Sequence, residues 1–79
     1  MTIAEATVKR LLELCSERNI TINKISISGI TQSTVSDIVN GTTTNTGIVT
    51  IKKLCDGFDI SVRAFFDSPL FDDLEQEVR

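Results

Sequence analysis

Residues 1–19 show the spacing of an amphipathic helix. Apolar side chains recur at intervals of three and four residues, and charged side chains occupy the positions between them. Thr2 and Glu5 have the spacing of a capping box, which satisfies backbone N–H groups at a helix start. We therefore predict a helix of about four turns that closes near Asn19. Its expected inward stripe is Val8, Leu11, Leu12 and Cys15, and its expected outer face is Lys9, Arg10, Glu13, Glu17 and Arg18.

Residues 20–28 fit two kinds of element. Isoleucines at positions 20, 22, 25 and 27 alternate as in a strand, and β-branched residues favour strands. The alternation slips at Asn23-Lys24, however, and nothing else in the chain offers a partner strand. We therefore favour a short helix capped by Thr21, with Ile22 and Ile25 facing inward, over the strand.

The segment 29–41 predicts a tight turn followed by a short helix with a Thr31 N-cap. Ile30 and Val35 have the spacing of a hydrophobic staple, and Asn40-Gly41 is a typical helix stop. Serine and threonine are mediocre helix formers because their side chains compete for backbone hydrogen bonds. Hydroxyls nevertheless crowd this helix, so we interpret its polar face as a contact surface. The expected buried stripe is Val35, Ile38 and Val39, and the hydroxyl side chains are Thr31, Ser33, Thr34 and Ser36.

The rest of the chain predicts a polar loop at 42–46 and three further short helices. The first runs from Gly47 to Asp56 and ends at Gly57, and Ser61 caps the second. Ser68-Pro69 has the N-cap and N1 pattern that opens the third. Their expected apolar faces are Ile48, Ile51, Leu54 and Cys55; then Val62, Phe65 and Phe66; then Phe71, Leu74 and Val78. The expected fold is all-α, a compact bundle of five short helices plus a C-terminal helix.

Length and composition describe one small globular domain. The chain has 79 residues, of which 41% are hydrophobic and 24% charged. No apolar run is long enough for a membrane span or a signal peptide, so we expect no membrane partner and a cytoplasmic location. Cys15 and Cys55 occupy apolar helical positions, which favours two reduced core cysteines. Because histidine is absent, we expect no zinc site and no cofactor.

The net charge of −3 is unevenly placed along the chain. Residues 1–69 contain seven Lys or Arg and seven Asp or Glu, whereas residues 70–79 contain four acids and one Arg. The body of the domain is therefore neutral, without the basic surface expected of a strong DNA binder. The many serines also lack a base to activate them, so we do not expect an enzyme.

The sequence predicts two short helices joined by a glycine turn, and the second helix has a polar outer face. This pattern is typical of a helix-turn-helix. The residues that match a known family in order and spacing are Ser28-Gly29-Ile30-Thr31, Ser33-Thr34-Val35-Ser36-Asp37-Ile38, Asn40-Gly41, Thr50-Ile51-Lys52-Lys53-Leu54-Cys55, Ile60-Ser61-Val62 and Phe65-Phe66. On these residues, roughly 7–67, the chain resembles the Cro and phage-repressor-like (XRE) helix-turn-helix family. The resemblance implies a lambda-repressor-like bundle, with a DNA-binding domain at 1–67 and the helix at 68–79 as a possible dimerisation element.

The resemblance implies a transcriptional regulator that reads double-stranded DNA with its third helix, as a homodimer and without a small-molecule effector. Glutamine can bond adenine bidentately, serine both donates and accepts, and aspartate can only accept. The implied base contacts are Gln32, Ser33, Ser36 and Asp37. The implied phosphate contacts are Thr21, Lys24, Thr31, Asn40, Thr42 and Thr44.

Three departures from the family pattern keep a second function open. The stretch between Thr21 and Gly29 is one residue shorter than usual, and Asp37 brings a negative charge to the contact face. The loop at 42–46 has threonines where the family commonly has cations and a proline, and each lost cation weakens phosphate binding. The alternative is a protein-interaction module of the same fold, an antitoxin or anti-repressor-type partner, with weak or lost DNA binding.

Overall fold

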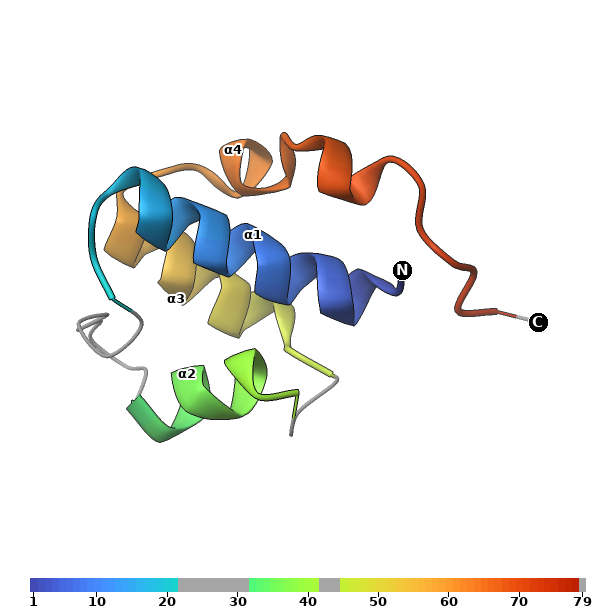
Figure 1. Ribbon diagram of the computed structural model, residues 1–79, viewed down its shortest axis with the longest axis horizontal. Helices are drawn as coiled ribbons and strands as arrows, with labels where there is room; N and C mark the ends of the chain where they lie inside the picture. The colour runs from blue at the N-terminus through green and yellow to red at the C-terminus, as the bar shows by residue number, and fades with distance from the viewer. Residues whose placement is uncertain (22–31, 42–44, 79) are drawn as a thin grey trace.

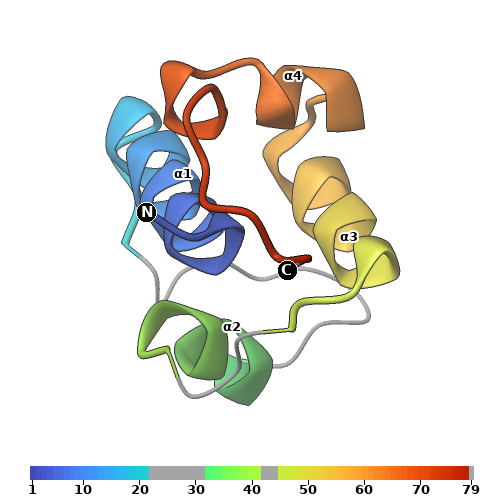
Figure 2. The same cartoon turned by 90° about the vertical axis from the view of Figure 1, so that its right-hand side faces the viewer.

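A computed structural model of the protein describes residues 1–21, 32–41 and 45–78, with only the backbone at positions 32 and 33. Its elements are α1 (Ile3–Glu17), α2 (Gln32–Val39), α3 (Ile48–Phe58), α4 (Val62–Phe66) and the 3-10 turn η2 (Pro69–Phe71). Helices α1 and α3 run side by side, with α2 on one side of them and α4 and η2 on the opposite side (Figures 1 and 2). The predicted all-α class is confirmed, and no strand occurs in the described ranges. The helix predicted within 20–28 and the turn at Gly29 lie largely outside the described residues.

The start of α1 is set by local hydrogen bonds. The Glu5 backbone N–H donates to Thr2 Oγ1 at 3.2 Å, and the Thr2 N–H donates to Glu5 Oε1 at 3.0 Å. This is the predicted capping box. These hydrogen bonds hold the pKa of Glu5 below its ordinary value, because they favour the ionised carboxylate. At the other end Asn19 adopts a left-handed conformation with φ of 53°, which fits the predicted closure near this residue.

The buried face of α1 is rotated from the predicted stripe. Leu11 and Cys15 are buried as expected, but Leu14 is buried in place of Leu12, which is 42% exposed. Arg10, predicted on the outer face, is only 8% exposed. The physical reason is that α1 packs on two sides, against α2 and against η2, so its covered arc is wider than one apolar stripe.

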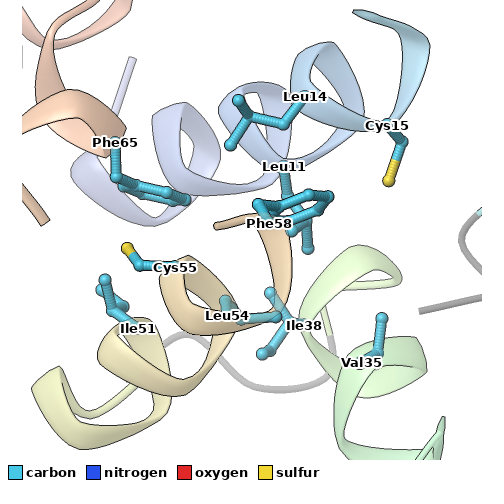
Figure 3. Packing of buried hydrophobic residues seen from close by; sticks show 10 residues of the cluster. All are labelled: Leu11, Leu14, Cys15, Val35, Ile38, Ile51, Leu54, Cys55, Phe58 and Phe65. Atoms are coloured by element: carbon cyan, nitrogen blue, oxygen red, sulfur yellow. The ribbon is translucent and has the colours of Figure 1, made fainter. Parts of the chain in front are cut away.

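The helices enclose one hydrophobic core. Val35 and Ile38 of α2 are buried in the same cluster as Ile51 of α3 and Phe65 of α4, as predicted. Figure 3 shows the side chains of this cluster meeting between the helices. Both cysteines are free and buried, which confirms that prediction, and burial raises the pKa of each thiol. The full cluster is Leu11, Leu14, Cys15, Val35, Ile38, Ile51, Leu54, Cys55, Phe58 and Phe65.

Helix α3 starts at its predicted position, with Gly47 as N-cap, but ends later than its sequence pattern predicts. The predicted terminator, Gly57, lies inside the helix, and Asp59 takes the left-handed conformation that ends it, with φ of 57°. Phe58 is buried in the core, so the extra residues bring an aromatic ring into the packed interior. Ile48 was predicted to face inward but is 66% exposed in the first turn.

The C-terminal segment does not form the helix predicted for 68–79. Ser68 caps η2 and Pro69 opens it, as predicted, but the regular structure stops at Phe71. The Phe71 ring lies edge-on to Phe66, with centroids 4.9 Å apart, and this packing directs the chain back onto α4. Beyond it, residues 72–78 are irregular, so Phe71, Leu74 and Val78 do not share a helical face. No helix in the described ranges is long and apolar enough to cross a membrane.

Candidate nucleic-acid interface

The predicted contact residues fall into three groups. Side chains of Thr21, Ser36, Asp37 and Asn40 are described, and Gln32 and Ser33 are described as backbone in the first turn of α2. The remaining four, Lys24, Thr31, Thr42 and Thr44, lie outside the described residues. The described part of the predicted interface is therefore the outward side of α2, together with Thr21, which follows the end of α1 and is exposed.

Helix α2 packs against the core through the side chains of its apolar face. Val35 and Ile38 are buried and point toward the core (Figure 3). With 3.6 residues per turn, positions 36, 37 and 40 cannot all share that side. Asp37 and Asn40 are exposed, and Ser36 is half-buried. The predicted division of α2 into a narrow buried stripe and a polar outer face is confirmed at these positions.

The end of α2 is locally ordered by Asn40 and Gly41. The Asn40 backbone N–H donates to the Ser36 carbonyl at 2.9 Å, and the Gly41 N–H donates to the Ile38 carbonyl at 3.2 Å. Gly41 has φ of 75°, the left-handed conformation predicted for a helix stop. The Asn40 side chain also donates from Nδ2 to Ser36 Oγ at 3.3 Å. Sequence reasoning missed this contact, although the spacing of four residues on a helix is its signal.

Charge on this surface is sparse. Asp37 is the only ionisable side chain within α2. Several cations of the domain are engaged elsewhere: Arg18 donates to the Phe58 carbonyl at 3.1 Å and lies over the Phe58 ring. Lys52 forms an ion pair with Asp56. The described face can therefore offer neutral donors and acceptors to a nucleic acid, with one carboxylate among them.

Arg10 holds the domain together on the side away from α2. Its Nε donates to the Phe65 carbonyl at 2.7 Å, and Nη2 donates to the Ala64 carbonyl at 2.9 Å. Nη1 forms an ion pair with Glu13. Because these carbonyls belong to the last turn of α4, the guanidinium joins α1 to α4. Arg10, which the sequence pattern predicts on an exposed helix face, is therefore a structural residue.

A small hollow lies between the start of α1 and the start of α3. Its volume is about 180 Å³, and its lining includes Ile3, Thr46 and Ile51. A larger and more open hollow of about 450 Å³ borders Met1, Glu13 and Leu70 beside η2. In the described ranges no three His, Cys, Asp or Glu side chains gather where they could hold a metal ion. The outward face of α2 is the candidate site, because the described polar residues predicted to contact DNA gather there.

Comparisons with known proteins identify the family of the domain. A family profile described as a Cro/C1-type HTH DNA-binding domain matches residues 9–65. The solved structure titled "Crystal structure of the prophage Lp1 protein 11" shares 36% sequence identity and superposes with a TM-score of 0.77. That alignment covers 94% of this chain and 100% of the prophage protein. No curated protein gives a significant match.

Proposed function

The chain belongs to the Cro/C1-type helix-turn-helix DNA-binding domain family, and we propose that it is a sequence-specific transcriptional regulator that reads an operator with α2. The family is one of DNA-binding domains rather than of enzymes. The observation that carries the proposal is the orientation of α2: Val35 and Ile38 anchor it in the core, and its polar side chains face outward.

The chemistry of the outward face suits base edges in a major groove. Ser36 can donate or accept a hydrogen bond, and Asp37 can accept one from a cytosine amino group. Gln32, in the first turn of α2, has the side chain that bonds adenine bidentately. Ser33 completes the proposed base contacts. The proposed phosphate contacts are Thr21, Lys24, Thr31, Asn40, Thr42 and Thr44.

We propose that the protein binds DNA as a homodimer. One copy of α2 has eight residues and can make only a few base contacts, each worth about 1–3 kcal/mol. A second copy on a two-fold axis doubles that number and predicts a near-palindromic operator. Sedimentation with and without operator DNA tests this. A chain ending at Asp73 tests the role of the tail, because it keeps the Phe71 contact with the core.

Selection of binding sites from a random DNA pool tests the proposed function. We expect a preferred sequence, and Gln32→Ala should relax one of its positions at a cost of about 1–3 kcal/mol. Gln76→Ala, in the exposed C-terminal segment, is the matched control and should leave the preference unchanged. If the wild-type protein selects no sequence, the operator-reading proposal is wrong.

The second candidate, a protein-interaction module, is favoured by the charge of α2. Its one ionisable side chain is a carboxylate, which repels phosphate. Retention on random DNA at low salt separates the two functions. A protein that is not retained, and that selects no site, would have a partner protein as its ligand rather than DNA.

A further inference from the structure

One end of the molecule gathers most of its exposed apolar side chains. Helices α1 and α3 run in the same direction, and Arg18, just past the end of α1, donates to the carbonyl of Phe58, the last residue of α3. The starts of both helices lie at the opposite end, on the right in Figure 1 and toward the viewer in Figure 2. In the described ranges six large apolar side chains are exposed, and five belong to this end, which we call the apolar end: Met1, Ile3, Ile48, Val49 and Val78.

The C-terminal tail is fixed at the apolar end by contacts of its own. The Glu75 backbone N–H donates to the Met1 carbonyl at 3.0 Å, beside the start of α1. Two residues further on, Glu77 lines the small hollow between the starts of α1 and α3, together with Ile3 and Thr46. Val78 follows directly and is 85% exposed. The tail therefore brings an exposed apolar residue next to the hollow.

The apolar end has the features that a two-fold interface needs. The same patch meets itself in such an interface, so it must carry both a projecting part and a recess. Val78 projects, and the neighbouring hollow of about 180 Å³ has Ile3, Ile51 and Phe66 in its lining. A cavity of about 150 Å³ accepts a benzene-sized group, so this hollow has room for one apolar side chain. A projection and a recess on one patch fit a second copy of the same chain.

We infer that the apolar end is the surface through which two copies of this chain form a homodimer. The inference rests on the proposed function, because it names the interface of the homodimer proposed there. Helix α2 lies along one long side of the molecule, so a two-fold axis across the apolar end can leave both copies of α2 on the same side (Figure 1). Two copies joined in this way lie about one molecular length apart, which is 37 Å. Half-sites one DNA turn apart are separated by about 34–36 Å, so this dimer can span two of them.

The size of the apolar end predicts a weak dimer. The two shorter dimensions of the molecule are 23 and 19 Å, so an end-to-end contact covers less than the roughly 800 Å² per partner of a standard interface. Exposed apolar side chains still stabilise the pair when they are buried, and each one contributes twice across a two-fold axis. DNA that holds two copies on adjacent half-sites raises their effective concentration and strengthens the dimer.

The test compares the double variant Ile48→Gln/Val49→Gln with the single variant Leu12→Gln. Glutamine removes apolar surface without adding a charge, so the electrostatic interaction with phosphate is unchanged. Leu12 is 42% exposed and lies outside the apolar end, which makes it the matched control. Sedimentation of each full chain, alone and with selected DNA, measures the dimer at increasing protein concentration. We expect the double variant to weaken dimerisation at least about tenfold and Leu12→Gln to leave it unchanged.

Circular dichroism melts check that the variants stay folded, which we expect because both substituted side chains are exposed. Val78→Gln repeats the comparison in the irregular tail, where no helix is altered. The inference is overturned if the apolar-end variants dimerise as the wild type does, or if Leu12→Gln weakens the dimer equally. A wild type that stays monomeric both alone and on DNA also overturns it.

The same measurements separate this inference from operator reading. A wild type that selects no DNA site but dimerises through the apolar end refutes operator reading and supports the interface. A selected site that the apolar-end variants still bind as dimers refutes only the interface.

Discussion

Replacing Arg10 by methionine tests whether the hydrogen bonds from Arg10 of α1 to the carbonyls of α4 stabilise the fold. Methionine keeps a long apolar stem and removes only the guanidinium, so the packing of α1 is largely retained. The change takes away the donors to the Phe65 carbonyl, at 2.7 Å, and to the Ala64 carbonyl, at 2.9 Å. It also removes the ion pair with Glu13.

The expected loss follows from the burial of these groups. The buried Phe65 carbonyl loses its Arg10 partner, which costs about 1–3 kcal/mol, whereas the Ala64 carbonyl still accepts from the Asp67 backbone N–H at 3.3 Å. The Glu13 side chain is 43% exposed, so its ion pair adds little. We therefore expect the free energy of unfolding to fall by about 1–3 kcal/mol. A domain of this length has about 4–12 kcal/mol in total, so the loss is a large part of it.

Urea unfolding followed by circular dichroism measures this loss. Arg63→Met is the matched control, because Arg63 lies exposed on the same helix α4, and it should change the free energy of unfolding by less than about 0.5 kcal/mol. If Arg10→Met is as stable as Arg63→Met, the hydrogen bonds of Arg10 do not hold α4 in place. The reasoning from buried carbonyls would then be refuted.

Three further predictions follow from the same structure. Val35→Ala should cost about 1–3 kcal/mol of unfolding free energy, because it opens a cavity under α2, and a lowered urea midpoint with an unchanged slope would show it. The pKa of Glu5 is lowered by its bonds to Thr2, so the stability that the carboxylate contributes is present above the ordinary value of 4.5 and is lost as pH falls below it. Melting temperatures should therefore fall more steeply with acid for the wild type than for Glu5→Gln. Asp37→Asn should raise affinity for random DNA about two- to fivefold at low salt, whereas Asp67→Asn, at the C-cap of α4, should have a smaller effect because α4 lies on the opposite side of the bundle from α2.

The candidate site could be predicted in outline from the sequence. The alternation of apolar and hydroxyl side chains in 31–41 is enough to separate the buried stripe of α2 from its outward face. It also places the helix end at Asn40 and Gly41, because the left-handed conformation there favours glycine. The hydrogen bond between Asn40 and Ser36 could not be predicted in the same way. Side chains at that spacing can meet, but each could equally bond water.

The starts of three elements are where the sequence by itself determined the structure. The Thr2–Glu5 box, the Ser61 cap of α4 and the Ser68-Pro69 start of η2 all form as their residue patterns predict. The physical reason is that each of these bonds joins groups two or three residues apart. Their formation therefore depends little on the rest of the chain.

Which faces are buried, and how far an element continues, was decided only by the tertiary structure. Leu12 and Leu14 both fit a helical apolar pattern, and only the packing of α2 and η2 around α1 covers Leu14 and leaves Leu12 exposed. Arg10 is buried because the carbonyl end of α4 lies against it. In the tail, the Phe71 ring packs on Phe66, and the regular structure ends at Phe71. Burial depends on neighbours that are distant in sequence, so no local sequence pattern can predict it.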